Sequence, residues 1–282
     1  MVAARSGSIG LALGSGGAKG LAHIVVLETL DELGLQPSTI CGSSIGAIAG
    51  AAYASGMDGK QMRAFVLDGI ADPLRAVREL MRCRIGGFGD LFSVGGNPVL
   101  LDAASVIDKF LPAGVPAKFA DLRIPFTAVA TDFYGKTHVA FDNGALRPAL
   151  AASMAIPGIF RPVEIGGRVL IDGGVTDPLP FDIVAERARI VIAVDVNGSP
   201  RKGDRRGGSV PRPLDVLFAS IQIMSHAITA EKLARNRPAI VIAPAISRFR
   251  VFDFLKAREI LKAAAPAKDE LKRALDAALE RH

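Results

Sequence analysis

Short apolar runs alternate along the chain with longer segments in which apolar residues recur at helical spacing. Residues 9–13 form a continuous apolar run that ends at a glycine, which is typical of a strand buried on both faces of a parallel sheet. After a glycine-rich turn, residues 18–33 are expected to form a helix that ends at Gly34. A second short strand is expected at 39–41 and an alanine-rich helix at 45–54. The start of the chain therefore predicts a strand–helix–strand–helix unit.

This alternation continues through the rest of the chain. Further strands are expected at 125–133, 137–141, 163–165, 168–171, 189–196 and 239–243, and helices at 60–82 with a break at Pro73, at 214–236 and at 254–282. Two glycines between the strands at 163–165 and 168–171 are the signal for a two-residue hairpin turn. The pattern predicts an α/β fold with a mostly parallel central sheet, whose site lies at the carboxyl ends of the strands.

Two stretches are expected to be loops. Residues 84–98 are rich in glycine and are either a lid or rim of a binding site or an ordinary surface connection. Residues 198–213 are rich in glycine and charged residues, and they separate the predicted strand before them from a long helix. Neither stretch has the hydrophobic periodicity of a helix or strand.

Composition excludes several classes of protein. Half of the residues are hydrophobic and 22% are charged, so the chain can build a core and disorder is not expected. Cys41 and Cys83 are too few for a disulfide scaffold or a cysteine-based zinc site, and we expect both to be buried thiols. The chain has no Trp and two Tyr, so it lacks the aromatic residues of a single-strand nucleic-acid platform, and no nucleic acid is expected as a partner.

Positive charge is concentrated in the last third of the chain. Residues 201–282 contain 17 Lys and Arg against 9 Asp and Glu, whereas residues 1–200 contain 17 against 19. A basic region of this kind can approach an anionic membrane, although a solvated helical face has the same composition. The longest uncharged run, 33–57, contains a proline and many small residues, which favours buried elements over a membrane span. We expect a cytoplasmic protein, with association to a membrane as an open alternative.

A glycine-rich loop follows the first predicted strand. The sequence GSGGAKG at 14–20 can expose backbone N–H groups at the start of a helix, where they bind a phosphate or a transient oxyanion. The phosphate motifs do not fit this loop. Lys19 is followed by Gly20 where a Walker A loop has Ser or Thr, and Lys19 also occupies the position of the last glycine of G-x-G-x-x-G.

Two further motifs bring a nucleophile and a carboxylate. Residues 42–46, GSSIG, have the form G-x-S-x-G between a predicted strand and a predicted helix, where the glycines allow a sharp turn that presents the Ser44 hydroxyl. Ser43 is a local rival, but its neighbours do not complete the pattern. The third motif, DGG at 172–174, places Asp172 after a strand, where an Asp is otherwise often a turn residue.

A serine nucleophile needs a base, and the histidines are poorly placed to provide one. His23 lies in the first helix, His138 in a strand before Asp172, His226 inside a long helix, and His282 at the last position. None lies in a loop after a late strand, where a Ser–His–Asp enzyme of α/β-hydrolase order has its histidine. A carboxylate therefore remains as the base for Ser44. No cluster of His and Asp has the spacing of metal ligands, so no metal is expected.

The three motifs together resemble those of the patatin-like phospholipase family. Their order and spacing match, and so do neighbouring segments such as ASMAIPGIFRPV at 152–163. Ser15 differs, because many members of the family have a glycine there. The resemblance is strong over residues 8–200. It implies one three-layer α/β/α patatin-like domain over residues 1–282, with a core of about 8–200 and a helical and strand extension at 214–282.

The resemblance also implies roles for individual residues. Ser44 would be the nucleophile and Asp172 the base of a catalytic dyad, and the backbone N–H groups of Gly16, Gly17 and Ala18 would form the oxyanion hole. The substrates would be acyl lipids such as phospholipids and lysophospholipids, and no cofactor would be needed. We therefore expect a lipid acyl hydrolase that acts through an acyl-enzyme, and we expect burial to raise the pKa of Asp172.

Three alternatives stay open. The protein could be a catalytically silent module that binds acyl lipids, although intact Ser44 and Asp172 argue against this. It could be an acyltransferase, because the same acyl-enzyme can pass its acyl group to an alcohol or a carrier. It could also be a nucleotide-binding α/β protein that uses the loop at 14–20.

Overall fold

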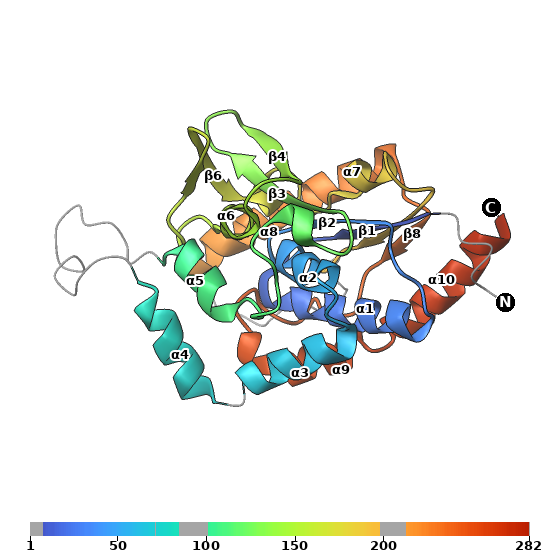
Figure 1. The fold of residues 1–282 in the computed structure, drawn as a ribbon, viewed down its shortest axis with the longest axis horizontal. Coiled ribbons are helices and arrows are strands. Elements are labelled where there is room, and N and C mark those ends of the chain that lie inside the picture. Colours follow the sequence, from blue (N-terminus) through green and yellow to red (C-terminus); the bar gives the residue numbers. More distant parts are fainter. Residues whose placement is uncertain (1–7, 71, 85–100, 198–212, 282) are drawn as a thin grey trace.

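An eight-stranded sheet forms the centre of the protein (Figure 1). The computed structural model describes residues 8–70, 72–84, 101–197 and 213–281. The strands found in these ranges are β1 (Ile9–Leu13), β2 (Thr39–Ser43), β3 (Phe126–Asp132), β4 (Thr137–Phe141), β5 (Val163–Ile165), β6 (Arg168–Asp172), β7 (Ile190–Val194) and β8 (Ile240–Ile242). Their order across the sheet is β5-β6-β3-β2-β1-β7-β8, and β4 pairs with β3 beside this path.

The sheet is mostly parallel, as predicted. Strands β3, β2, β1, β7 and β8 pair in parallel, whereas β4, β5 and β6 join the sheet through antiparallel pairs. The strand bounds agree with the predicted ones to within two residues. They could be predicted because a strand buried on both faces is a continuous apolar run. The predicted hairpin between β5 and β6 is also confirmed, since Gly166 and Gly167 both have positive φ angles, of 59° and 75°.

The helices agree with the pattern less completely than the strands. The α-helices of the described residues are α1 (His23–Glu32), α2 (Ile45–Ala54), α3 (Gly59–Gly69), α4 (Pro73–Arg82), α5 (Ala103–Phe110), α6 (Leu146–Ser153), α7 (Phe181–Ala185), α8 (Pro213–Arg235), α9 (Ala257–Ala264) and α10 (Ala267–Arg281). Short 3-10 helices are η1 (Gly17–Ala22), η3 (Phe119–Asp121), η4 (Gly173–Val175) and η5 (Phe254–Lys256). The break predicted at Pro73 is confirmed as the start of α4, whereas α5, α6 and α7 were not predicted.

The helix expected at 18–33 is a 3-10 helix in its first part. Residues Gly17–Ala22 form η1, and the α-helix begins at His23. Gly20 lies so close to Ile45 of α2 that a Cβ atom at this position would come within 2.2 Å of the Ile45 side chain. The tighter turn therefore lets the glycine-rich loop pass against the start of α2. This correction matters because the loop lies beside Ser44, the residue immediately before α2.

Helices cover both faces of the sheet. Leu11 and Leu13 of β1 belong to the larger apolar core, which contains buried residues of α1, α2, α9 and α10. Ala12 points to the other face and belongs to a second core with residues of α7, onto which Leu233 of α8 packs. Figure 1 shows α1, α2 and α10 on one side of the sheet and α7 on the other. The three-layer α/β/α fold is confirmed.

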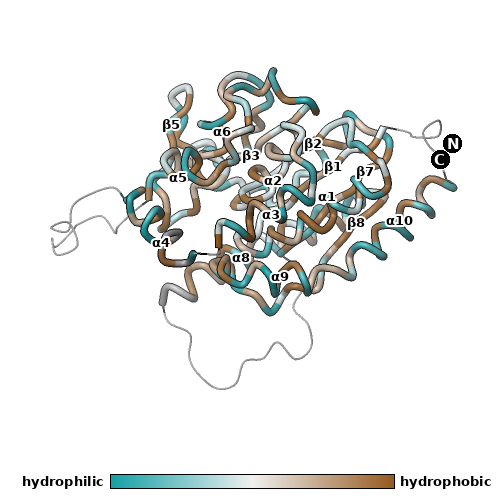
Figure 2. The backbone as a smooth tube through the Cα atoms, turned by 60° about the horizontal axis from the view of Figure 1, so that its bottom comes forward, coloured by the Kyte–Doolittle hydropathy of each residue, from teal (hydrophilic) through white to brown (hydrophobic). Residues whose placement is uncertain are grey.

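Helix α10 packs on the core with one of its faces. Hydrophilic and hydrophobic colours alternate along α10 in Figure 2, as expected for a helix with one face on a core.

Cys41 and Cys83 are buried free thiols, as predicted. The candidate lid at 84–98 and the loop at 198–213 lie outside the described residues except for Arg84 and Pro213. No helix in the described ranges combines the length and the apolar composition that crossing a bilayer requires.

Helix α8 is anchored to α7 and to the segment before it by a lysine in its C-terminal half. Lys232 Nζ donates hydrogen bonds of 2.6 Å to Asp177 Oδ1 and of 2.6 Å to Asp182 Oδ1. The Asp177 side chain is almost fully buried, with 2% of its surface exposed, so its charge depends on this partner. The N-terminal half of α8 lies farther along the same face, next to the candidate site described below.

We expect Lys232→Ala to lower the free energy of unfolding by about 3 kcal/mol, because a buried carboxylate is left without its partner. Urea unfolding followed by circular dichroism measures this change. The control is Arg235→Ala on the same helix, which breaks an exposed ion pair with Glu231 and is expected to change stability by less than about 1 kcal/mol. Equal losses in the two variants would contradict the anchoring role of Lys232.

Candidate active site

Two strands meet end to end along one edge of β3. Ala128 and Val129 pair with both β2 and β4, and the following residues 130–132 pair with both β4 and β6. Strands β2 and β6 therefore share the edge of β3 that is opposite β4. They run toward each other, so Ser43 at the end of β2 pairs with Val129 and Asp172 at the end of β6 pairs with Ala130. This arrangement brings two carboxyl-terminal strand ends to one point.

Ser44 lies at a sharp turn between β2 and α2. Its φ and ψ angles are 56° and −124°, a conformation that L-residues rarely adopt and that stores strain. The glycines on either side make the turn possible by close backbone contact. A Cβ atom at Gly42 would lie 2.4 Å from the Gly46 carbonyl oxygen, and one at Gly46 would lie 2.1 Å from that of Leu13. The predicted G-x-S-x-G turn is therefore present in the structure.

The turn places the Ser44 hydroxyl against Asp172. Ser44 Oγ donates a hydrogen bond of 2.5 Å to Asp172 Oδ2, across 128 residues of sequence. Both side chains are buried. The rival Ser43 is fully buried as well, but its hydroxyl has no hydrogen-bond partner among the residues that the structure describes. The geometry thus brings together Ser44 and Asp172 and does not bring Ser43 to the carboxylate.

Backbone groups fix the Asp172 carboxylate. Gly174 N–H donates 2.7 Å to Oδ1, which leaves Oδ2 facing Ser44. The Asp172 carbonyl accepts a hydrogen bond from Thr131 Oγ1, and its N–H donates to the Ala155 carbonyl. Burial raises the pKa of Asp172 to about 6, and the hydrogen bonds from Ser44 and from Gly174 N–H partly oppose this increase. The rise in the pKa of Asp172 that the sequence predicted is confirmed.

Ser153 holds the Ser44 backbone and was missed at the sequence level. Ser44 N–H donates 2.9 Å to Ser153 Oγ, and Ser153 Oγ donates 2.6 Å to the carbonyl of Val129 on β3. The strained turn is thus tied to the strand that both β2 and β6 flank. A serine at the end of an alanine-rich helix has no spacing signal of its own. The segment 152–163, quoted for its family resemblance, was the one available pointer.

The glycine-rich loop lies beside the dyad and offers two of its three predicted donors. The N–H groups of Gly14 and Ser15 donate to the carbonyls of Val194 and Pro178. In the described part of the chain, the N–H groups of Gly16 and Gly17 have no backbone or side-chain acceptor. Ala18 differs, because its N–H donates 2.7 Å to the carbonyl of Val251. The Ala18 N–H is therefore already occupied in this conformation.

None of the histidines among the described residues forms a hydrogen bond to Ser44 or Asp172. His23 is fully buried, and since a carbonyl can only accept, its Nε2–H donates the 2.8 Å hydrogen bond to the Gly14 carbonyl. Burial lowers the pKa of His23 to about 4, which keeps the ring neutral at pH 7. His23 thus supports the glycine-rich loop through this hydrogen bond, whereas His138 lies exposed on β4.

A cavity of about 50 Å³ opens onto the dyad. It lies between the glycine-rich loop, the segment around Ile156 and Pro157, and helix α8, and Ser44 and Asp172 both line it. Pockets that bind drug-sized ligands have volumes of roughly 300–1,000 Å³, so a lipid chain does not fit this conformation. Ser225 of α8 donates 2.8 Å to the Gly174 carbonyl and thereby fixes one wall of the cavity to the DGG motif.

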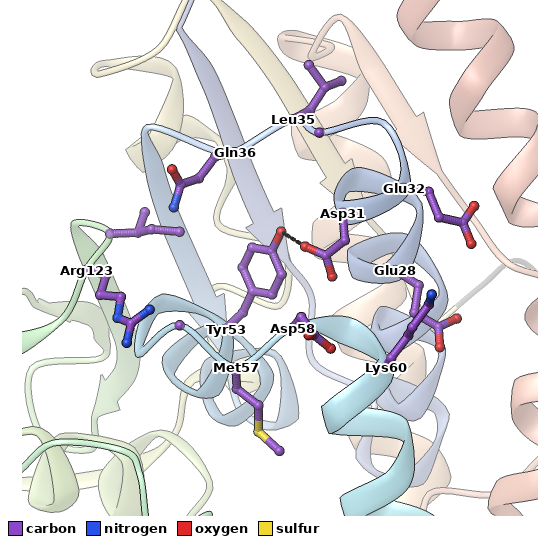
Figure 3. A pocket seen from close by; sticks show the side chains of 13 residues that line it. Glu28, Asp31, Glu32, Leu35, Gln36, Tyr53, Met57, Asp58, Lys60 and Arg123 are labelled. Carbon is purple, nitrogen blue, oxygen red and sulfur yellow. Dashed lines mark hydrogen bonds between the residues drawn. The ribbon is translucent and has the colours of Figure 1, made fainter.

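A larger cavity, of about 420 Å³, lies at the other end of α2 (Figure 3). Ser44 precedes the first turn of α2, whereas Tyr53 in this cavity belongs to its last turn, about 15 Å away along the helix. Tyr53 Oη donates 2.7 Å to Asp31 Oδ1, and Glu28 and Glu32 in the wall are already paired with basic side chains. No serine, threonine or cysteine is among the residues that line this cavity, so it has no counterpart of the Ser44–Asp172 pair.

Fold and site together define an α/β protein with a serine–aspartate pair at a strained strand-to-helix turn. The family profile described as patatin-like phospholipase matches residues 11–185. The chain belongs to this family.

Several known proteins are similar to this chain. An uncharacterized NTE family protein of Mycobacterium tuberculosis is 39% identical over 192 residues, which cover 68% of this chain and 49% of that protein. The lysophospholipase NTE1 of Candida glabrata is 28% identical over 283 residues, which cover 92% of this chain and 16% of the relative. The chain therefore spans about half, or less, of the length of these curated relatives.

Solved structures give weaker matches. The crystal structure of VipD from Legionella pneumophila aligns with a TM-score of 0.47 and 14% identity, covering 94% of this chain and 67% of that one. Human GIVD cytosolic phospholipase A2 aligns with a TM-score of 0.46 and 12% identity, covering 99% and 60%.

We expect Ser153→Ala to destabilise the protein by about 1–3 kcal/mol, because the buried Ser44 N–H loses its acceptor. The Ser44 turn should also become less well fixed, so the rate at which a fluorophosphonate labels Ser44 should fall. Unfolding in urea and labelling kinetics measure the two effects. Ser55→Ala is the control, since its hydroxyl donates to a carbonyl of its own helix turn. Labelling of Ser153→Ala at the rate of the unmodified protein would contradict the positioning role.

Asp172→Asn is expected to stabilise the protein at neutral pH. An unfolded Asp loses its proton near pH 3.9, whereas Asp172 loses it at about 6 in the folded state. Between these values the folded state binds more protons, so the stability of the unmodified protein falls as pH rises through this window. The amide does not titrate, so the variant should be more stable by about 1–3 kcal/mol above pH 6 and gain less near pH 4. Urea unfolding at the two pH values tests this, and a less stable variant at neutral pH would contradict it.

Proposed function

We propose that the protein is a serine esterase that hydrolyses carboxylic ester bonds of acyl lipids, with Ser44 as the nucleophile and Asp172 as the base. The observation that carries this proposal is the 2.5 Å hydrogen bond from Ser44 Oγ to Asp172 Oδ2 at a strained turn. Membership of the patatin-like phospholipase family supports a phospholipid or lysophospholipid as the substrate class.

In the first half-reaction Ser44 Oγ attacks the carbonyl carbon of the ester while Asp172 Oδ2 takes the hydroxyl proton. A pKa of about 6 leaves Asp172 mostly ionised at pH 7 and makes it a stronger base than an exposed Asp. The tetrahedral intermediate then collapses, and the proton on Asp172 passes to the leaving alcohol. The acyl group remains on Ser44 as an ester.

In the second half-reaction a water molecule replaces the alcohol. Asp172 takes a proton from this water, and the water oxygen attacks the acyl carbon. Collapse of the second intermediate releases the fatty acid, and the proton returns from Asp172 to Ser44 Oγ. Because the carboxylate is held at Oδ1 by Gly174 N–H, the same oxygen, Oδ2, serves both steps.

The N–H groups of Gly16 and Gly17 would stabilise the oxyanion of both intermediates. They line the cavity beside Ser44 and are free to donate. A single donor of this kind typically contributes about 2.7–4 kcal/mol to transition-state stabilisation. Ala18 N–H can act as a third donor once it leaves the Val251 carbonyl. No step in this scheme needs a cofactor or a metal.

The proposed location and partners of the protein follow from its proposed lipid substrate. We expect a cytoplasmic enzyme that makes peripheral contact with the membrane that contains its lipid, and we expect no nucleic-acid partner. Transfer of the acyl group to an alcohol other than water remains an alternative fate of the acyl-enzyme, and a silent lipid-binding module remains an alternative without chemistry.

The test is to treat the purified protein with a fluorophosphonate probe and to follow p-nitrophenyl ester hydrolysis. Ser44→Ala and Asp172→Asn are the variants, and Ser43→Ala is the matched control next to the nucleophile. We expect labelling and turnover in the unmodified protein and in the control, and their loss in both dyad variants. Loss of turnover by a factor of roughly 10³ or more is expected when a member of a dyad is removed.

The outcomes separate the alternatives. Labelling without turnover, with acyl products appearing when an alcohol is added, would indicate an acyltransferase. No labelling of a folded protein would overturn the proposal in favour of the silent module. Labelling that survives in Ser44→Ala would show that another residue is the nucleophile.

A further inference from the structure

The outer face of α8 is apolar and has no partner among the described residues. Val216, Leu217, Ile223 and Met224 are exposed, and their spacing places them on one face of the helix. Ile223 is the most exposed of them, at 67%. No charged residue occurs between Asp215 and Glu231, so both faces of this part of α8 are free of charge. The inner face has the polar residues Gln222 and Ser225, whereas the exposed face is apolar, and an apolar helix face is normally covered.

A second exposed apolar segment joins this face. Phe252, Phe254 and Leu255 precede α9 and are all exposed. Phe252 contacts Phe218 of α8 edge-to-face, with the ring centroids 5.0 Å apart. We call the seven exposed residues on α8 and in this segment the apolar rim. The rim residues are Val216, Leu217, Ile223, Met224, Phe252, Phe254 and Leu255.

The apolar rim surrounds the cavity of the dyad. Phe218 and Ile221 of α8 line the cavity from the inner face of the helix whose outer face carries Leu217 and Ile223. Val251 lines it from the chain next to Phe252. The Leu217 side chain also lies next to Gly158, and Gly158 follows Pro157, which lines the cavity. The rim is therefore continuous with the walls of the site.

Positive charge flanks the apolar rim. Arg248, Arg250, Lys256 and Arg258 are exposed. Lys256 forms an ion pair with Asp253, and Glu259 follows Arg258, so residues 248–259 have four basic and two acidic side chains, a net charge of +2. Apolar side chains bordered by Lys and Arg are typical of a surface that inserts into the interface of an anionic membrane. A second copy of the chain bound through the same face would bring two such cationic borders together, which is unfavourable.

We infer that the apolar rim is a docking surface for an anionic phospholipid bilayer. The inference deepens the proposed function and rests on it for the meaning of the site, since docking places the cavity mouth at the lipid. The apolar side chains enter the interface and the four cations contact lipid phosphates. Each cation near such a surface contributes about 1 kcal/mol, so the group and the apolar side chains together can hold the protein on the bilayer.

Docking also bears on access to Ser44. The cavity of about 50 Å³ does not accommodate an acyl chain, and its outer wall is made by α8 and Val251, the elements that carry or adjoin the rim. Phe252 and Phe254 lie within three residues of Val251, whose carbonyl accepts the Ala18 N–H. Insertion of the rim into lipid therefore acts on the same wall that must move for a lipid substrate to enter.

The test measures binding without catalysis. Ser44→Ala protein is sedimented with vesicles of phosphatidylcholine and phosphatidylglycerol, and with vesicles of phosphatidylcholine alone. We expect binding to the anionic vesicles, weakened by salt, and a loss of roughly tenfold or more when Ile223→Glu and Leu255→Glu are added, because two exposed apolar side chains become charged. Leu33→Glu is the matched control. It is also an exposed leucine, but it lies at the end of α1 by the larger cavity and should bind as before.

A parallel measurement keeps folding and function separate from docking. In the protein with intact Ser44, the Ile223→Glu and Leu255→Glu variant should keep its hydrolysis of a short water-soluble ester and lose hydrolysis of vesicle phospholipid. Vesicle binding that the two substitutions leave unchanged would overturn the inference, and so would absence of binding to anionic vesicles. A rim-dependent dimer without vesicle binding would also overturn it. Docking without any ester hydrolysis would overturn the proposed function and leave the docking surface standing.

Discussion

The site depends on one constraint of the sheet, the end-to-end meeting of β2 and β6 along the same edge of β3. Each strand alone would leave a serine or a carboxylate at an ordinary strand end. Because Val129 and Ala130 are consecutive, the residues paired with them are brought side by side, and the nucleophile turn begins where the carboxylate strand stops. The hydrogen bond between Ser44 and Asp172 then spans 128 residues of sequence with no flexible element between its partners and β3. Ser153 adds a third tie to the same strand through Val129.

This arrangement holds two unfavourable features in place. Ser44 has a positive φ angle, and Asp172 is a carboxylate removed from water. Each costs about 1–3 kcal/mol, and such costs persist when the surrounding structure fixes them. Here the fixing elements are close backbone contacts at Gly42 and Gly46 and the N–H group of Gly174. A relaxed serine would point away from the carboxylate, and a solvated aspartate would be a weaker base, so the proposed reaction depends on both the strain and the burial.

The strands and the Ser44 turn could be predicted from the sequence because each has a local signal, whereas the three layers and the role of Asp172 were predicted from the resemblance to the patatin-like family. Buried strands are apolar runs, and G-x-S-x-G and DGG carry their turns in their own glycines. The features that the sequence did not predict depend on residues distant in sequence. The hydrogen bonds from Ala18 N–H to the Val251 carbonyl and from Ser44 N–H to Ser153 Oγ join residues far apart in sequence. The residues adjacent to either partner in the sequence give no sign of them. The 3-10 helix before α1 likewise reflects contact with Ile45 rather than local propensity. Helices α5 and α6 have eight residues each, a length at which an isolated helix is not stable, so tertiary packing decides whether they form.

Composition alone left two interpretations of the basic last third of the chain, a solvated helical face or a membrane contact. In the structure, the basic side chains of this region fall into two groups that differ in their neighbours. Lys232 is half-buried and neutralises Asp177 and Asp182, and Lys268 pairs with Glu32, so these lysines stabilise the fold. The cations at 248–258 lie in the segment that contains the exposed Phe252 and Phe254, and one of them, Lys256, pairs with Asp253. On α8 the same division occurs within one helix. Its inner face packs on the DGG motif through Ser225, whereas its outer face is apolar and is covered by none of the residues that the structure describes. Packing among the described residues accounts for the inner face alone, and the apolar outer face beside the proposed ester-hydrolysing site is accounted for if the lipid surface that contains the proposed substrate covers it.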